Sequence, residues 1–229
     1  MRKIIPLLML LALISCEVSV NKDKSRKKSE GDTEEKHRAI VSVRKRLVYI
    51  LPLGEVPSEY IDQIKSAVKI FYDYDCSVLP QAKPSEDIMA ASKTRLEASK
   101  ILAKYKSKEQ KLIITEEDIA FKYVQKGIEE YGIMGMGYYP GTTSVVSTFR
   151  LKRQHGTRGP LVPARLFTER LQKVTLHEIG HNLGLDHCTN HPECLMSSAN
   201  GTMKQVDRQK MWLCDSCKKL LEMKNRSIH

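Results

Sequence analysis

The sequence predicts a single α+β domain in which a β-sheet supports a helix that carries metal-binding side chains. Two observations lead to this prediction. Short β-branched apolar runs alternate with helical patterns across residues 47–151. A histidine-rich stretch at 177–188 is then followed by cysteines at a spacing typical of zinc sites. The 229 residues hold only one such domain, because roughly 180 residues remain once the N-terminal segment is set aside.

The N-terminus has the features of an export signal. Arg2 and Lys3 precede an apolar run at 4–14 that is too short to span a membrane permanently. Residues 1–15 resemble a bacterial lipoprotein signal peptide, with Cys16 as the residue that would receive lipid. An uncleaved core helix or a transmembrane anchor is the alternative. We expect an exported lipoprotein, tethered to a membrane surface of a bacterial cell envelope through Cys16.

Residues 16–45 have the composition of a flexible charged linker. Lys, Arg, Glu, Asp and Ser dominate residues 17–36, where large apolar side chains are nearly absent, so this part cannot bury enough surface to fold. Much of the formal net charge of +11 lies in the run from Lys22 to Arg46. Charge alone is compatible with nucleic-acid binding, but an exported protein would rarely meet nucleic acid. We therefore expect no nucleic-acid partner, and a folded domain at 46–229.

The first elements of that domain are read from apolar patterning. A β-branched and aromatic run predicts a strand at 47–53. After Pro57, Ser58 can cap a helix in which apolar residues recur at helical spacing as far as Phe71. The charged segment 84–106, with interspersed Ala, Leu and Ile, predicts a second helix.

The middle of the domain predicts a strand, a helix and two further strands. Residues 112–114 read as a short buried strand. The sequence T-E-E-D at 115–118 resembles a capping box and predicts a helix through about Tyr131. Glycine and proline bound residues 134–139, and together with 144–151 they predict two consecutive strands.

The last third predicts a loop followed by two helices. Residues 155–163 are rich in Gly, Pro and Arg and read as a loop near the cleft. Residues 164–184 are expected to form the helix that carries the histidines. A final helix at 206–224 would carry the last two cysteines.

The motif H-E-x-x-H at 177–181 predicts a catalytic metal site. His177 and His181 stand four residues apart on one helix face and can bind one metal ion, while Glu178 can reach a water on that ion. Gly184 can end the helix in the left-handed conformation, which lets His187 arrive as a third ligand. The short motif can arise by chance on an ordinary helix, but the glycine and third histidine are independent requirements. Three ligands leave one position open, as catalytic zinc requires.

A second metal site is predicted from four cysteines. If the chain is extended at His187 and Cys188, their side chains point to opposite sides, so one segment can serve two metal sites. A pair of disulfides is the alternative, which export would favour. Cys76 stands apart and is expected to be a buried small hydrophobe. The four residues that match a closed tetrahedral zinc site are Cys188, Cys194, Cys214 and Cys217.

The combined motifs resemble those of the archaemetzincin family of metzincin-clan zinc peptidases. These motifs are H-E-x-x-H-x-x-G-x-x-H-C at 177–188, C-x-M at 194–196 and C-x-x-C at 214–217. Residues 112–119 and 145–151 are also similar to strand-containing segments of the family. The resemblance covers most of the chain from about residue 46 onward. It implies a zincin-like metzincin fold with a mixed β-sheet, an active-site helix and a C-terminal zinc-bound subdomain.

The resemblance also implies roles for single residues. His177, His181 and His187 would hold a catalytic zinc with Glu178 as general base, and the four cysteines a structural zinc. Met196 is the candidate for the methionine that underlies the catalytic metal in metzincins, with Met203 as competitor.

Metzincins receive an extended peptide antiparallel to an edge strand above the cleft, and residues 134–139 are the candidate strand. Tyr138 or Tyr139 could donate there to a developing oxyanion, although the sequence favours a core or rim role for each.

The expected activity is peptide-bond hydrolysis by attack of a zinc-bound water, with Glu178 as the general base. The expected partners are a peptide or protein substrate and a membrane surface, and the protein is expected to be a monomer. A non-catalytic zinc-binding lipoprotein, acting as scaffold or adhesion module, is the alternative, but a purely structural site has no use for Glu178. A zinc-ribbon nucleic-acid binder built on the cysteines would show steeply salt-dependent binding. Archaemetzincins are as a rule soluble intracellular proteins, so an exported member departs from the family.

Overall fold

The computed structural model describes residues 46–199 and 201–226, so the expected signal peptide, Cys16 and the linker lie outside the described residues. A five-stranded mixed sheet forms the centre, in the order β2-β1-β4-β8-β7. Its strands are β1 (Leu47–Leu53), β2 (Asp75–Val78), β4 (Lys111–Thr115), β7 (Gly135–Gly137) and β8 (Thr143–Ser147). Four of them run parallel, and β7 pairs antiparallel with β8 at one edge. The predicted α+β fold with a mixed sheet is confirmed.

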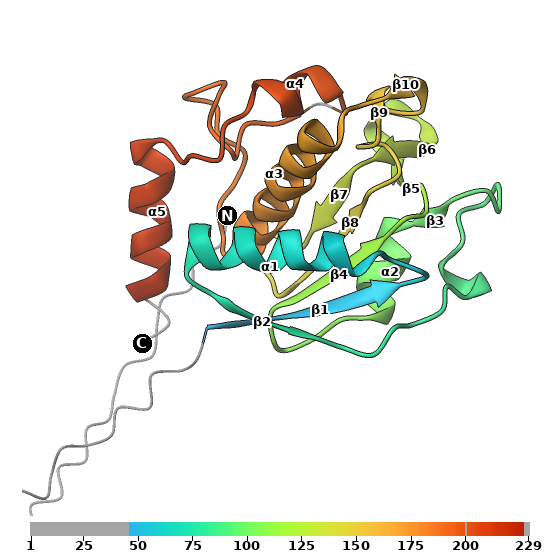
Figure 1. Ribbon diagram of the computed structural model, residues 1–229, viewed down its shortest axis with the longest axis horizontal. Helices are drawn as coiled ribbons and strands as arrows, with labels where there is room; N and C mark the ends of the chain where they lie inside the picture. Colours follow the sequence, from blue (N-terminus) through green and yellow to red (C-terminus); the bar gives the residue numbers. More distant parts are fainter. Residues whose placement is uncertain (1–45, 200, 227–229) are drawn as a thin grey trace, which may run out of the picture. The chain divides into compact units, whose positions relative to one another are not determined.

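Helices cover both faces of this sheet. On one face lie α1 (Ser58–Tyr72) and α3 (Ala164–Asn182), and on the other lies α2 (Ala98–Lys104) (Figure 1). The side chains of β4 alternate between two cores, with Leu112 and Ile114 on the α1/α3 side and Ile113 on the α2 side. All three are fully buried, which explains why this strand reads as an unbroken apolar run.

The predicted helix at 84–106 is wrong for most of its length. Only Ala98–Lys104 is an α-helix; before it come a 3-10 turn, η1 (Glu86–Ile88), and a short strand, β3 (Leu96–Glu97). Lys93 adopts a left-handed backbone conformation that an α-helix cannot contain. The helix predicted to begin after Pro57 is confirmed, but Ser58 is its first residue and not its cap.

The predicted helix at 115–131 is also wrong. The chain instead forms β5 (Ile119–Tyr123), a 3-10 turn η2 (Val124–Lys126) and β6 (Ile128–Ile133). Thr115 does use its hydroxyl locally, accepting a hydrogen bond from the amide of Glu117, but only a turn follows. The next residues are β-branched and aromatic, and they pair in a three-stranded sheet of order β3-β5-β6. Gly127 takes the left-handed conformation that reverses the chain.

Two predictions near the C-terminal end need correction. The expected loop at 155–163 contains a hairpin of β9 (Arg153–His155) and β10 (Arg158–Leu161). The expected helix at 206–224 is two helices, α4 (Met203–Arg208) and α5 (Asp215–Arg226). The chain leaves helical conformation between them, where the amide of Leu195 donates to the carbonyl of Trp212 at 2.8 Å.

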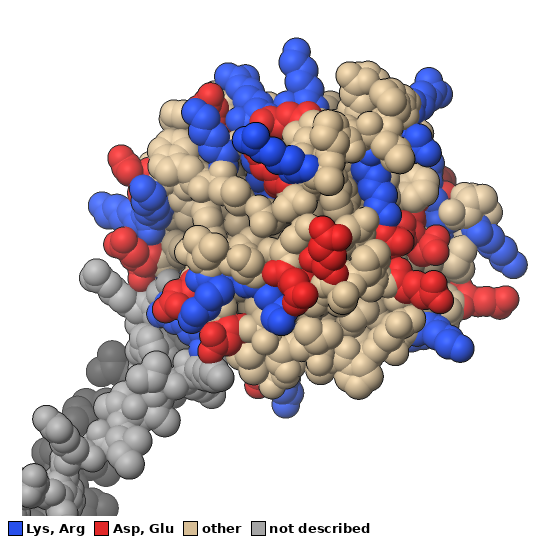
Figure 2. Space-filling view, in the orientation of Figure 1, with Lys and Arg blue, Asp and Glu red and all other residues tan. Residues whose placement is uncertain are grey.

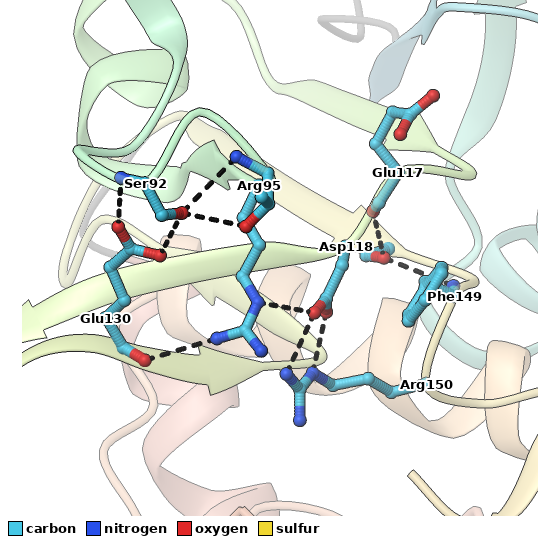
Figure 3. Close-up of polar contacts among 9 residues, drawn as sticks. Ser92, Arg95, Glu117, Asp118, Glu130, Phe149 and Arg150 are labelled. Atoms are coloured by element: carbon cyan, nitrogen blue, oxygen red, sulfur yellow. Dashed lines mark hydrogen bonds and ion pairs between the residues drawn. The ribbon is translucent and has the colours of Figure 1, made fainter. Parts of the chain in front are cut away.

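A buried carboxylate ties the β5–β6 hairpin to the rest of the domain. Asp118 accepts two hydrogen bonds from the guanidinium of Arg150, at 2.7 and 2.9 Å. It also forms an ion pair with Arg95 at 2.9 Å. Arg95 also donates to the carbonyl of Glu130 in β6, whose carboxylate accepts from Ser92 (Figure 3). The hairpin is therefore held at both of its strands.

The surface shown in Figure 2 mixes basic and acidic side chains around uncharged areas. Ion pairs between exposed side chains include Lys69 with Asp73 and Lys104 with Asp87. Within residues 46–199 and 201–226, no helix is both long and apolar enough to cross a membrane.

Candidate metal and catalytic site

The three predicted histidines meet at the C-terminal end of α3. His177 and His181 project from its last turns, and His187 follows six residues after the second of them. One ring nitrogen from each histidine lies within 4.8 Å of those from the other two. The chain reaches this arrangement through Gly184, which has φ +85° and whose amide donates to the carbonyl of His181. The predicted glycine stop and the convergence of the three rings are confirmed.

Backbone carbonyls orient the two helical imidazoles. The Nδ1 atom of His177 lies 2.7 Å from the carbonyl oxygen of Leu195, and Nδ1 of His181 lies 2.8 Å from that of Leu185. A carbonyl can only accept, so each Nδ1 carries the proton and each Nε2 presents a lone pair. The two Nε2 atoms are 3.1 Å apart and face each other without a proton between them. Such a pair of lone pairs suits a shared cation.

Burial keeps these imidazoles neutral near pH 7. It lowers the pKa of His177 to about 3, and it also lowers the pKa values of His181 and His187. The neutral form is the one that binds a metal ion, because a protonated ring nitrogen has no lone pair to donate.

Glu178 lies beside the histidines, directly against the edge strand β7. Its side chain is 7% exposed, and burial raises its pKa to about 8. A Cβ atom built on Gly135 would lie 2.7 Å from Cγ and 2.8 Å from Oε1 of Glu178. At Gly137 a Cβ atom would lie 2.8 Å from the carbonyl oxygen of Glu178. The two glycines therefore let β7 approach α3 closely enough to border the site.

Asn182 fixes the same strand from the end of α3. Its side-chain amide donates to the carbonyls of Tyr138, at 2.9 Å, and Thr143, at 3.1 Å. The main-chain carbonyl of Asn182 accepts from the amide of Gly141. The β7–β8 turn is thus anchored to the helix that carries the histidines, one residue after His181.

The four predicted cysteines also meet. Their sulfur atoms lie within 4.8 Å of one another, and all four are free thiols. Sγ of Cys188 is 3.6 Å from that of Cys214, and Sγ of Cys194 is 3.8 Å from that of Cys217. Cys214 precedes α5 and Cys217 lies in its first turn, so only the latter is carried by a helix as predicted. His187 and Cys188 belong to different clusters, as expected for an extended chain.

Met196 packs against Gly180 of α3, one residue before His181. It is fully buried, and a Cβ atom built on Gly180 would lie 2.6 Å from its sulfur. Its carbonyl accepts from the amide of Cys188. Met203, the competing candidate, begins α4 as part of the same core.

The two tyrosines at the end of β7 point to different places. Tyr138 packs against the core on the α2 side of the sheet. Tyr139 is 53% exposed, and its ring centroid lies 6.1 Å from that of His181. Of the two, only Tyr139 lines the cavity beside the histidines.

Two cavities flank the histidines and Glu178. One, of about 310 Å³, is lined by Gly137, Tyr139 and His181. The other, of about 290 Å³, extends away from the site to Val174 and to aromatic side chains of β5 and β6. His177, Glu178 and His187 line both.

Sequence reasoning missed two features of this site. Asn182 was not singled out, and its position next to the predicted metal ligand His181 gave no signal of its own. The alternation G-x-G at 135–137 did carry a signal, since glycines inside a strand mark a close approach of another group. Cys76, which was expected to be buried and to stand apart from the other cysteines, lies in β2 and is only half-buried.

Known proteins are similar to this chain in sequence and in fold. The sequence model of Peptidase family M54 matches residues 110–223. Archaemetzincin of Haloquadratum walsbyi is 30% identical over 179 residues, which cover 76% of this chain and 99% of that protein. The crystal structure of archaemetzincin from Archaeoglobus fulgidus, complexed with malonate, has a TM-score of 0.64 and 29% identity, covering 76% of this chain and 99% of that one. Archaemetzincin from Methanopyrus kandleri, at 24% identity, shares the fold with a TM-score of 0.64 over 82% of this chain and 99% of that one.

These relatives are matched over nearly their whole length. Residues 110–223, which the family model matches, contain the histidines, Glu178 and the four cysteines. Zinc is the metal expected for this family, and both side-chain clusters are able to bind a metal ion. The chain therefore belongs to the archaemetzincin family of zinc metallopeptidases, hydrolases that act on peptide or protein substrates.

Proposed function

We propose that this protein binds two zinc ions, one catalytic and one structural, and hydrolyses peptide bonds with Glu178 as general base. His177, His181 and His187 would hold the catalytic ion, and the four cysteines the structural one. Met196 would form the apolar floor beneath the catalytic ion. The observation that carries the proposal is the pair of unprotonated Nε2 atoms that face each other 3.1 Å apart beside a buried carboxylate.

The distances within both clusters fit zinc. A tetrahedral ion with Zn–N bonds of about 2.0–2.1 Å sets neighbouring nitrogens roughly 3.3–3.4 Å apart. The Nε2 atoms of His177 and His181 are 3.1 Å apart. Zn–S bonds of about 2.3 Å set neighbouring sulfurs roughly 3.8 Å apart. The sulfur pairs of the cysteine cluster are 3.6 and 3.8 Å apart, far beyond the roughly 2.05 Å of a disulfide.

The residues around the histidines then perform the acid–base work. When bound, zinc supplies Lewis-acid polarisation of the scissile carbonyl and lowers the pKa of water. Glu178 takes a proton from the attacking water and passes it to the leaving amine. Burial raises its pKa to about 8, and a cation on the histidines opposes that shift by favouring the ionised carboxylate. The free edge of β7 would bind the substrate through main-chain hydrogen bonds, with Tyr139 placed to donate to the developing oxyanion.

Zinc content tests the metal assignment. We expect two zinc ions per chain in the wild-type protein and one in His181→Ala, which removes a histidine ligand and leaves the cysteine cluster intact. Peptidase activity should fall below detection in this variant, because the metal that activates water is lost. Elemental analysis of purified protein measures the content. One zinc in the wild type together with oxidised thiols would support disulfides, and none would remove the basis of the proposal.

The close approach of β7 to Glu178 predicts the effect of one added methyl group. In Gly135→Ala the new Cβ lies within 3.0 Å of three atoms of the Glu178 side chain, so the carboxylate or the strand has to move. A displacement of about 1 Å lowers turnover by roughly 100-fold. The measurement is kcat with a peptide substrate, alongside zinc content. Unchanged kcat, or loss of zinc, would contradict the assignment of Glu178 as the displaced group.

We also propose that the chain is an exported lipoprotein that acts as a monomer, tethered through lipid on Cys16. The support is the sequence of residues 1–16, which lie outside the described structure. Metabolic labelling with a fatty-acid analogue in a bacterial host should label the wild-type protein and leave Cys16→Ser unlabelled and released from membranes. Equal labelling of both proteins would refute the anchor.

A further inference from the structure

The cavity of about 290 Å³ beside Glu178 has an aromatic wall. Phe121 and Tyr123 of β5 and Tyr131 of β6 line one side, and Val174 of α3 lines another. We call this space the aromatic recess. Its volume lies at the lower limit of small-molecule pockets, roughly 300 Å³, so it suits a single large side chain rather than a whole cofactor.

The three rings contact one another while remaining partly accessible. Their centroids are 5.4–5.8 Å apart, and Tyr131 meets both Phe121 and Tyr123 edge to face. All three side chains are half-buried, unlike residues of the main core. Lys126 lies over the ring of Tyr123, with Nζ 5.0 Å from the centroid. Edge-to-face clusters of this kind accept a further ring in the same geometry.

The wall is fixed to the rest of the domain before any peptide arrives. The Asp118 network holds β5 and β6 through Arg95 and Arg150 (Figure 3). The guanidinium of Arg150 passes Gly132 in β6 so closely that a Cβ atom there would overlap it. A pocket whose wall is held in this way can select side chains without first being ordered by the substrate.

The direction of β7 shows which part of a peptide would meet the recess. Met134, just before β7, lines only the recess, and Gly135 lines both cavities. Gly137 and Tyr139, at and just after the end of β7, line only the second cavity. A peptide antiparallel to β7 runs from Gly137 towards Gly135 as it passes Glu178. Residues after the cleaved bond therefore lie over the recess.

We propose that the aromatic recess makes this enzyme select peptides with an aromatic residue directly after the cleaved bond. The inference deepens the proposed function and rests on it for the orientation of the peptide. Phe121, Tyr123 and Tyr131 are the specificity-determining residues, and Ala199 lies at the side of the recess formed by the loop after Met196.

The test compares three short blocked peptides. One consists of alanine alone, and in the other two a single alanine is replaced by Phe or by Leu. Their binding to full-length, zinc-loaded Glu178→Gln is measured by calorimetry, so no turnover is needed. We expect the Phe peptide to bind at least about tenfold more tightly than the all-Ala peptide, with Leu between them. Equal binding of the three peptides, or no measurable binding of any, would overturn the proposal.

Variants of the recess locate the preference. Tyr123→Ala and Phe121→Ala, each in the Glu178→Gln background, should reduce the difference between Phe and Ala peptides to about twofold. Ala199→Leu fills the recess from a half-buried loop position and should likewise remove the advantage of Phe. The matched control is Phe149→Ala, since Phe149 is 41% exposed and does not line the recess. A preference that survives all three recess variants, with their melting temperatures unchanged, refutes the assignment.

Cleavage of a peptide library by the wild-type enzyme separates this inference from the proposed function. Cleavage with aromatic residues enriched directly after the cut bond supports both. Cleavage without that enrichment refutes the recess alone. A zinc-loaded protein that cleaves nothing, yet binds the Phe peptide selectively, would refute the proposed hydrolysis and leave the recess as an aromatic-binding site.

Discussion

Glu178→Gln is expected to lower kcat by about 10²–10⁴-fold and to leave the zinc content at the wild-type value. Glutamine keeps the shape of the side chain against Gly135 but cannot accept a proton from water. Residue 178 is not one of the proposed metal ligands. Steady-state kinetics with a peptide substrate and elemental analysis on the same preparation measure the two quantities.

The matched control for this variant is Glu59→Gln. Glu59 lies in the first turn of α1, is exposed and belongs to neither cluster. Its replacement should leave both kcat and zinc content unchanged. If Glu178→Gln retained near-wild-type turnover, the general base would have to be another group, and if it lost zinc, its effect could not be ascribed to proton transfer.

Cys194→Ser is expected to remove one zinc ion per chain and to lower the free energy of unfolding by about 4 kcal/mol, which corresponds to a melting temperature lower by roughly 8–16 °C. Cys194 is fully buried at the centre of the cysteine cluster, and its sulfur accepts from the amide of Cys214. This cluster joins the segment after the histidines to the start of α5. Loss of the cluster would therefore remove a contact that holds these two segments together. Differential scanning calorimetry and elemental analysis provide the measurements.

Cys76→Ser is the control for the loss of a thiol. Cys76 is half-buried in β2, and burial raises its pKa to about 11, so it remains a neutral thiol outside the cluster. Its variant should keep both zinc ions and lose little stability. Two zinc ions retained in Cys194→Ser, with an unchanged melting temperature, would exclude a structural ion at the cysteines.

The sequence predicted the positions of the site residues better than it predicted the elements around them. His177, Glu178 and His181 lie on one helix, where the period of the backbone fixes which side chains share a face. Gly184 adds a second local signal, because only glycine enters the left-handed conformation without strain. Such features depend on a few neighbouring residues, and the structure confirms them.

The β5–β6 hairpin shows why other parts could not be predicted. The sequence at 115–118 is typical of a helix N-terminus, and the hydroxyl of Thr115 does accept a local hydrogen bond. What decides the conformation is distant in sequence: β3 pairs with Ile119 and Ala120, and Arg150 binds Asp118. Asn182 was missed for the same reason, since its partners lie about 40 residues earlier. Tertiary contacts override local propensity at these places.

The adjacency of His187 and Cys188 couples the two proposed metal sites to each other. One peptide bond separates a residue of the histidine cluster from a residue of the cysteine cluster. Inserting or deleting a residue between His187 and Cys188 would misplace one of the two side chains, so we expect the length of this segment to be fixed. Oxidation of the thiols would also displace the neighbouring imidazole, so we expect peptidase activity to depend on the redox state of the four sulfur atoms.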